Sequence, residues 1–373
     1  MARSRERPLV VRLMPVLDFG GVEARVVLQS SASFSRSYDL RVCTFDKAKA
    51  AAEAVRAEGI EVDVLDTPAD PRSPVALRKL ISYLRRVAPD VLHSSISEAN
   101  VLGLVAASFA GVRARITEEV GVPDHSWKGR IAMAGLYRRA TRIVGVTDTT
   151  CRYLLDVDRA PRERVRRIYN CAHPRFFPSD RASVQRLTDR DELRVVAVGR
   201  LHPVKNHLGL LDAVSRIEHH NFSLHIIGNG PLEHQTRARI ESLGLSERVK
   251  LLGFQSDVRP QLLHADAFIL PSLSEGCSIS LIEAMASGVP VLGSNVPGIV
   301  EVMGTAHAAN WTFPPEDPGV MAAKLEQLFD MRADARTSYA AQLQDRAYRE
   351  FSPDAYMVNL EELYADALEA VGR

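Results

Sequence analysis

Short apolar runs rich in β-branched residues alternate with longer segments of helical periodicity along almost the whole chain. Some runs, such as Val195–Val198, contain no polar residue, as expected for strands that are covered on both faces. This alternation predicts an α/β fold built of parallel sheets with helices on both sides. We expect strands at Leu9–Val16, Asp39–Thr44, Ile60–Leu65, Val91–Ser94, Ala114–Thr117, Arg142–Val146, Leu193–Val198, Ser223–Ile227, Val249–Leu252, Ala267–Leu270 and Val289–Leu292.

The predicted strands form two series, separated by a polar and charged stretch that lacks a strand pattern. A chain of 373 residues also suits two domains better than one. We therefore expect an N-terminal domain over residues 1–175, a linker over 176–192 and a C-terminal domain over 193–352, followed by a last helix at 353–373.

The net charge of +1 conceals an asymmetry between the halves of the chain. Residues 1–180 hold 29 Lys and Arg against 21 Asp and Glu, and the second half is acidic. This difference suggests different partners for the two domains. The basic excess is too sparse to argue for nucleic acid, and no nucleic-acid-binding motif is present.

Two carboxylates, Glu275 and Glu283, flank the start of a helix that is expected to begin near residues 278–280. In a parallel sheet, ligands bind beyond the carboxyl ends of the strands, and the free N–H groups of a helix start can hold a phosphate there. We expect Glu275 in the loop and Glu283 in the first helical turn. The spacing alone also allows a capping box of Ser280 and Glu283, with Glu275 as a solvated loop acid.

Arg200 and Lys205 follow the predicted strand at Leu193–Val198 and precede the next helix. Charge-assisted hydrogen bonds from this pair could clamp a diphosphate and stabilise charge on a leaving phosphate. The alternative is a surface Arg and Lys near a helix N-terminus, which the helix dipole disfavours.

Glycines stand at other strand ends, at Gly20-Gly21 and at Gly228-Asn229-Gly230, and Phe254 follows the strand after that. Glycine allows a backbone to approach a ligand closely. Neither segment fits the dinucleotide fingerprint or the Walker pattern. Together, these placements predict a ligand cleft between two sheet domains.

These residues resemble the retaining glycosyltransferases of family 4, which have the GT-B fold of two Rossmann-like domains. The most specific part is residues 267–290, where Glu275 and Glu283 reproduce the E-x7-E signature of the family. Residues 198–205 resemble its VGRL…K segment, and residues 226–231 resemble its G-x-G-P turn.

The resemblance implies a retaining, metal-independent transfer of a sugar from a nucleotide-diphosphate donor, such as a UDP- or GDP-sugar, to a hydroxyl acceptor. Glu275 would lie against the sugar, and Arg200 and Lys205 would bind the diphosphate. The other donor contacts would come from Gly21, Gly228, Gly230, Phe254, Ser278, Ile279 and the ribose-binding Glu283. No cofactor is implied beyond the donor, and the helix at 353–373 would return to the first domain.

The chain departs from this family after the fifth predicted strand, where many relatives carry a histidine. Glu118 is expected to replace that histidine and to contact the sugar or the acceptor, so we count it with the catalytic residues. His93, at the end of the fourth strand, could be an alternative contact, although a packed or surface histidine is the more ordinary interpretation.

No metal site is predicted. Asp156-Val157-Asp158 matches the D-x-D metal motif of GT-A enzymes formally, but it lies at a helix end among charged residues. We therefore interpret this segment as a surface segment and not as a metal site.

Residues 126–142 contain five basic residues, no acid and several large apolar side chains. The segment resembles an amphipathic helix that binds anionic lipid headgroups, although a core-facing helix with a solvated basic face is the more ordinary interpretation. The chain shows no secretory h-region and no apolar stretch long enough to span a bilayer. We expect a cytoplasmic protein that is peripheral at the inner membrane if the helix binds lipid, with a lipid-linked or glycan-precursor acceptor.

Two other classes of function stay open at this point. A GT-B-like epimerase or phosphorylase is one alternative, although the cofactor lysine of a phosphorylase has no specific signal in this chain. A binding scaffold with a degenerate site is the other, and it would be expected to lose Arg200, Lys205 or Glu275.

Overall fold

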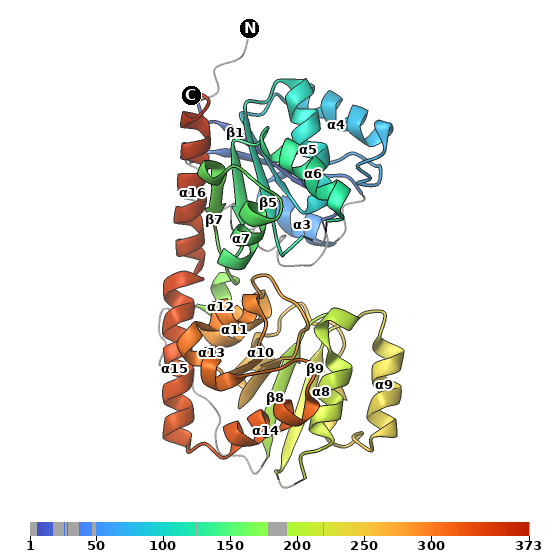
Figure 1. Cartoon of the computed structure of the whole chain (residues 1–373), viewed down its shortest axis with the longest axis vertical. Coiled ribbons are helices and arrows are strands. Elements are labelled where there is room, and N and C mark those ends of the chain that lie inside the picture. The colour runs from blue at the N-terminus through green and yellow to red at the C-terminus, as the bar shows by residue number, and fades with distance from the viewer. Residues whose placement is uncertain are drawn as a thin grey trace. The chain divides into compact units, whose positions relative to one another are not determined.

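The computed structural model describes residues 6–17, 26, 28, 37–46, 50–123, 125–177, 192–218 and 220–372. The chain forms two compact units, one comprising residues 1–170 with 353–373 and the other residues 171–352. Each unit holds one parallel sheet with helices packed against it (Figure 1). The predicted α/β class with two parallel sheets is therefore confirmed. Gly21 and most of the predicted linker lie outside the described residues.

The sheet of the first unit has the strand order β3-β2-β1-β4-β5-β6-β7, and its neighbouring strands are parallel. Its strands are β1 (Leu9–Met14), β2 (Asp39–Thr44), β3 (Glu61–Val64), β4 (Val91–Ser95), β5 (Ala114–Glu119), β6 (Arg142–Gly145) and β7 (Val165–Arg167). The helices described in this unit are α3 (Ala50–Ala57), α4 (Pro74–Val87), α5 (Ser97–Ala110), α6 (Trp127–Tyr137), α7 (Asp148–Asp156), the 3-10 helix η1 (Arg162–Arg164) and α16 (Pro353–Glu369).

The two faces of this sheet bury different side chains, because successive residues of a strand point to opposite faces. On one face, Leu92 of β4 belongs to an apolar core shared with α4 and α5. On the other face, the neighbouring His93 lies against Tyr364 of α16. The C-terminal helix thus covers a face that carries polar groups, and Arg142 and Arg166 fasten it further through ion pairs with Asp366.

The sheet of the second unit has the order β10-β9-β8-β11-β12-β13, again with parallel neighbours. Its strands are β8 (Leu193–Val198), β9 (Phe222–Ile227), β10 (Val249–Leu251), β11 (Ala267–Leu270), β12 (Val291–Ser294) and β13 (Thr312–Phe313). The helices are η2 (Pro174–Phe176), η4 (Pro203–Lys205), α8 (His207–Val214), α9 (Glu233–Ser242), α10 (Arg259–Leu263), α11 (Ile279–Ala286), α12 (Pro297–Met303), α13 (Thr305–Trp311), α14 (Pro318–Phe329) and α15 (Ala333–Glu350).

Both sheets reverse their winding at an interior pair of strands, β1 beside β4 in the first unit and β8 beside β11 in the second. The connections leaving such a pair go to opposite sides, which opens a crevice beyond the carboxyl ends of the strands where ligands bind. The loops that follow β8 and β11 are those that carry the residues singled out from the sequence.

Several details of the predicted strands need correction. Strand β1 ends at Met14 rather than at Val16, and some other ends differ by one residue. Strands β7 and β13 were not predicted, because runs of three and two residues are too short to show a period. The strand expected at Val289–Leu292 lies at Val291–Ser294. Strand β5 continues to Glu119, because its two glutamates are buried rather than solvated.

Among the described residues, no helix combines the length and the apolar character that crossing a bilayer requires.

Candidate functional site

An ion pair joins the two loops at the winding reversal of the second sheet. The Lys205 ammonium lies 2.5 Å from Glu275 Oε1, and Ser272 Oγ donates to the same oxygen at 2.7 Å. Lys205 ends η4, which follows β8, and Glu275 lies in the loop that follows β11. The side chains are 20% and 9% exposed, so the pair is shielded from water but still accessible. The structure therefore brings together two predicted site residues that are far apart in sequence.

The loop that carries Arg200 is held by close contact between backbones. A Cβ atom on Gly228 would lie 2.0 Å from the carbonyl oxygen of Gly199, and one on Gly230 would lie 2.5 Å from that of Leu201. Both glycines also have positive φ, which disfavours other residues. The two predicted glycines thus allow the turn after β9 to pack against the Arg200 loop.

A third glycine, Gly298 at the start of α12, was not singled out from the sequence. Its Cβ would meet the carbonyl oxygens of Gly276 and Glu275 at 2.1 and 2.3 Å, so no larger residue fits without a shift of the backbone. Gly298 therefore sets the position of the Glu275 loop. A Pro-Gly pair in the segment that follows the predicted strand Val289–Leu292 was the available signal.

Helix α11 begins beside the ion pair, with Ser278 as its N-cap residue and Ile279 as its first residue. Ser280 is the second residue of the helix and not its N-cap, so it does not form the alternative capping box with Glu283; its hydroxyl donates to the Val198 carbonyl at 3.2 Å. The N–H groups of the first turn have no acceptor within the helix, and they can therefore bind an anion. Glu283 lies in the second turn, not in the first turn as predicted, because the helix starts at Ile279.

Glu283 is a partly buried carboxyl group on α11. Burial raises its pKa to about 8, against the opposing effect of Arg175, and the charge of Asp257 raises the pKa further. Arg175 and Asp257 form an ion pair with each other at 3.3 Å. At neutral pH the Glu283 carboxyl is therefore mostly protonated, and a ligand that hydrogen-bonds to its ionised form would draw off a proton.

His207, the first residue of α8, is a buried neighbour of the site that sequence reasoning missed. Burial lowers its pKa to about 4, and the nearby Lys205 lowers it further. The imidazole is thus neutral at pH 7 and adds no positive charge beside Lys205.

The remaining predicted residues of this unit lie around the same strand ends. Arg200 is exposed, immediately after β8, and Phe254 is 52% exposed in the loop that follows β10. One exposed guanidinium, one ammonium, a carboxylate and the start of a helix therefore surround a single sheet edge. This combination can bind a diphosphate and hold a neutral, hydroxyl-rich group beside it.

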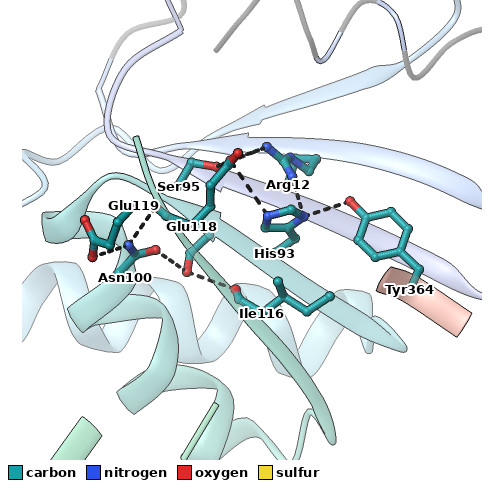
Figure 2. A network of polar contacts seen from close by, with 9 residues as sticks. Arg12, His93, Ser95, Asn100, Ile116, Glu118, Glu119 and Tyr364 are labelled. Carbon is teal, nitrogen blue, oxygen red and sulfur yellow. Dashed lines mark hydrogen bonds and ion pairs between the residues drawn. The ribbon is translucent and has the colours of Figure 1, made fainter. Parts of the chain in front are cut away.

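Glu118 belongs to a different network, in the first unit (Figure 2). Its Oε2 accepts hydrogen bonds from Arg12 Nη2 at 3.1 Å and from Ser95 Oγ at 2.6 Å. Arg12 also contacts His93 Nδ1, which lies 2.9 Å from the Tyr364 hydroxyl. The network links β1, β4 and β5 to α16, and its members are almost fully buried.

The position of Glu118 changes what the sequence suggested. It lies within β5 rather than after it and is 1% exposed, so a contact with sugar or acceptor stays a prediction that requires this network to open. His93, the alternative contact, is 1% exposed in the same network. An arginine within an otherwise apolar strand, Arg12, was the available signal.

The D-x-D match was wrongly interpreted as surface. Asp156 is exposed, but Asp158 is fully buried, and its Oδ2 lies 3.1 Å from His125 Nδ1. Its hydrogen bond raises the pKa of His125. Asp158 thus anchors the loop that precedes α6.

Two family descriptions match the chain, and together they span most of it. Residues 179–349 match "Glycosyl transferases group 1", and residues 20–171 match "Glycosyl transferase 4-like domain".

Curated relatives match over shorter segments. The amylovoran biosynthesis glycosyltransferase AmsK of Erwinia amylovora is 37% identical over 38% of this chain and 37% of its own length. The Escherichia coli UDP-Gal:alpha-D-GlcNAc-diphosphoundecaprenol alpha-1,3-galactosyltransferase is 27% identical over 61% of this chain and 63% of its own length. The matched segments therefore span less than two thirds of these relatives.

Solved structures of similar fold cover nearly the whole chain. Anabaena Alr3699/HepE in complex with UDP and glucose superposes with a TM-score of 0.82 at 19% identity, covering 96% of this chain and all of that one. The lipopolysaccharide outer core galactosyltransferase WaaB superposes with a TM-score of 0.73 at 18% identity, covering 96% and 99%. At these identities the likeness concerns the fold, and the predicted GT-B class is confirmed.

We predict that Glu118→Ala destabilises the first unit by about 3–5 kcal/mol, because it leaves the Arg12 guanidinium buried without its carboxylate. Replacing both partners by apolar residues, in Arg12→Met with Glu118→Leu, should cost clearly less than the single change. Urea unfolding followed by circular dichroism measures both variants. An alanine variant as stable as the wild type would show that the ion pair does not hold this network together.

Proposed function

The chain is a glycosyltransferase whose two halves match two glycosyltransferase descriptions, and on that premise we propose that it transfers a sugar from a nucleoside-diphosphate sugar to a hydroxyl acceptor. The observation that carries the proposal is the meeting of Lys205 and Glu275 beside the start of α11, at the carboxyl edge of β8 and β11. A cation and free N–H groups suit the diphosphate, and a carboxylate suits the hydroxyls of a sugar.

In the proposed site, Arg200 and Lys205 bind the diphosphate together with the N–H groups near Ser278 and Ile279. Their positive charge stabilises the leaving nucleoside diphosphate, so the transfer needs no metal ion. Glu275 orients the sugar. The reaction retains the anomeric configuration, with the leaving phosphate accepting the proton of the acceptor hydroxyl.

The other predicted donor contacts complete the proposal. Glu283 accepts hydrogen bonds from the ribose, and Phe254 borders the base. Gly228 and Gly230 keep the Arg200 loop in place. UDP is the favoured nucleotide, because a structure of similar fold binds UDP and glucose.

We also propose a lipid-linked acceptor and a peripheral contact with the inner membrane face. A relative acts on a diphosphoundecaprenol-linked acceptor, as its name states. Helix α6 supports the membrane contact, because Trp127 and Ile131 are each 67% exposed one turn apart. Lys128 lies 5.4 Å above the Trp127 ring, so apolar and basic groups occur together on this helix, as in helices that bind anionic membranes.

Donor binding is tested by thermal unfolding with UDP, GDP, ADP and TDP and their sugar conjugates. A nucleotide present at about 100 times its Kd should stabilise the protein by about 2.7 kcal/mol. Arg200→Ala should weaken this binding about tenfold to hundredfold, because it removes a charge-assisted hydrogen bond. Arg332→Ala is the matched control, because the Arg332 side chain is 82% exposed and is not among the proposed donor contacts. No stabilisation by any of the nucleotides would contradict the proposal.

The raised pKa of Glu283 predicts how donor binding depends on pH. Ribose hydroxyls donate to the ionised carboxylate, so affinity should rise as pH increases from 7 through about 8 and then level off. Calorimetry at pH 7.5 in buffers of different ionisation enthalpy should show proton release on binding. Glu283→Gln should remove both the release and the slope, and a slope unchanged in that variant would exclude Glu283 as its source.

Membrane contact is tested by flotation with vesicles of phosphatidylcholine, with and without phosphatidylglycerol. The wild type should float only with the anionic lipid, and Trp127→Ser with Ile131→Ser should reduce recovery at least severalfold. Val75→Ser, an equally simple loss of an exposed apolar side chain on α4, should float like the wild type. Flotation of the α6 variant at the wild-type level would refute the contact.

A further inference from the structure

Four arginines gather at the amino-terminal edge of β5 and β6 in the first unit, and we call them the arginine cluster. They are Arg115 on β5, Arg138 and Arg139 directly after α6, and Arg164 at the end of η1. This edge lies at the opposite ends of the strands from the carboxyl edge, where ligands of parallel sheets normally bind.

Hydrogen bonds fix the positions of these arginines. Arg164 Nη1 donates to the carbonyl oxygens of Arg138 and Ala140, at 2.6 and 2.7 Å, and so reaches the backbone on both sides of Arg139. Arg115 Nη1 donates to Ser108 Oγ at 2.9 Å, while its backbone N–H donates to Thr141 Oγ1. Backbone and hydroxyl acceptors thus hold two guanidinium groups without neutralising them.

The cluster is short of negative charge. Among the described residues, no carboxylate lies within ion-pair distance of Arg115, Arg138 or Arg139, and Arg164 is 3.9 Å from Glu163, whose side chain is 74% exposed. Burial lowers the pKa of Arg115, and the charges of Arg139 and Arg164 lower it further. These guanidinium groups therefore repel one another in the folded protein.

The cluster also contains guanidinium N–H groups that have no hydrogen-bond acceptor among the described residues. Arg115 Nε is buried and has no hydrogen-bond partner in the described part of the chain. Arg138 and Arg139 are exposed, and none of their guanidinium N–H groups is engaged among the described residues. A multiply charged oxyanion would supply acceptors for these donors and cancel the repulsion, which is the chemistry that arginine forks recognise.

We propose that the arginine cluster binds a phosphate group, presented either by a soluble phosphate or diphosphate or by the headgroup of an anionic lipid. The cluster shares no residue with the proposed donor site, and its arginines all belong to the first unit. It also does not depend on the chain being a transferase.

Equilibrium dialysis with radiolabelled pyrophosphate tests the soluble source. The experiment uses full-length protein carrying Arg200→Ala, so that the proposed donor site binds the probe only weakly, at constant ionic strength. Adding Arg139→Ala should weaken pyrophosphate binding at least tenfold, whereas adding Arg78→Ala, at an exposed arginine on α4, should not change it.

Thermal unfolding without any phosphate separates binding from a structural role. Arg139→Ala should melt at the same temperature as the parent or above it, because the change removes a repelling charge. A structural arginine would instead lower the melting temperature when removed. A clear loss of stability in Arg139→Ala without phosphate would therefore count against the proposal.

Flotation with phosphatidylcholine vesicles, with and without phosphatidic acid, tests the lipid source. Loss of flotation in Arg139→Ala assigns the headgroup to the cluster, whereas loss only in the Trp127 and Ile131 variant assigns lipid binding to α6 alone. The proposal is overturned if Arg139→Ala changes neither pyrophosphate binding nor flotation.

Discussion

The adjacency of β8 and β11 is the constraint on which the candidate site depends. Because the winding of the second sheet reverses between these strands, the loops that leave them meet although Lys205 and Glu275 are far apart in sequence. The ion pair, the hydrogen bond from Ser272 and the start of α11 all follow from this one neighbour relation. A different strand order would scatter the same residues along the sheet edge.

The close approach of backbone segments at glycines then determines how precisely those loops are placed. Gly228 and Gly230 bring one turn against the Arg200 loop, and Gly298 brings α12 against the Glu275 loop. These contacts involve carbonyl oxygens of the main chain, which cannot move aside as a flexible side chain can. The polar side chains of the site therefore stand on a rigid backbone frame, as a site that must orient a diphosphate requires.

Much of the fold could be predicted from sequence, because buried parallel strands leave continuous apolar runs such as Val195–Val198. The positions of Arg200, Lys205 and Glu275 at strand ends could also be predicted, since loops at those ends carry ligand-binding residues. The burial of Glu118 could not be predicted, because it depends on contacts with Arg12 and Ser95, which are distant in the chain. The place of Gly298 was missed for the same reason.

The two sheets share one winding pattern but differ in how the charged groups near the winding reversal are paired. In the first sheet, the protein fills the region near β1 and β4 with its own charges, since Arg12 and Glu118 neutralise each other below the helix α16. In the second sheet, Lys205 is paired with Glu275, but Arg200 is exposed, and the first-turn N–H groups of α11 have no acceptor within their own helix. A region that satisfies its own charges gives a ligand little to bind, whereas unsatisfied donors attract an anion. This difference is why we propose that the donor binds at the second sheet rather than at the first.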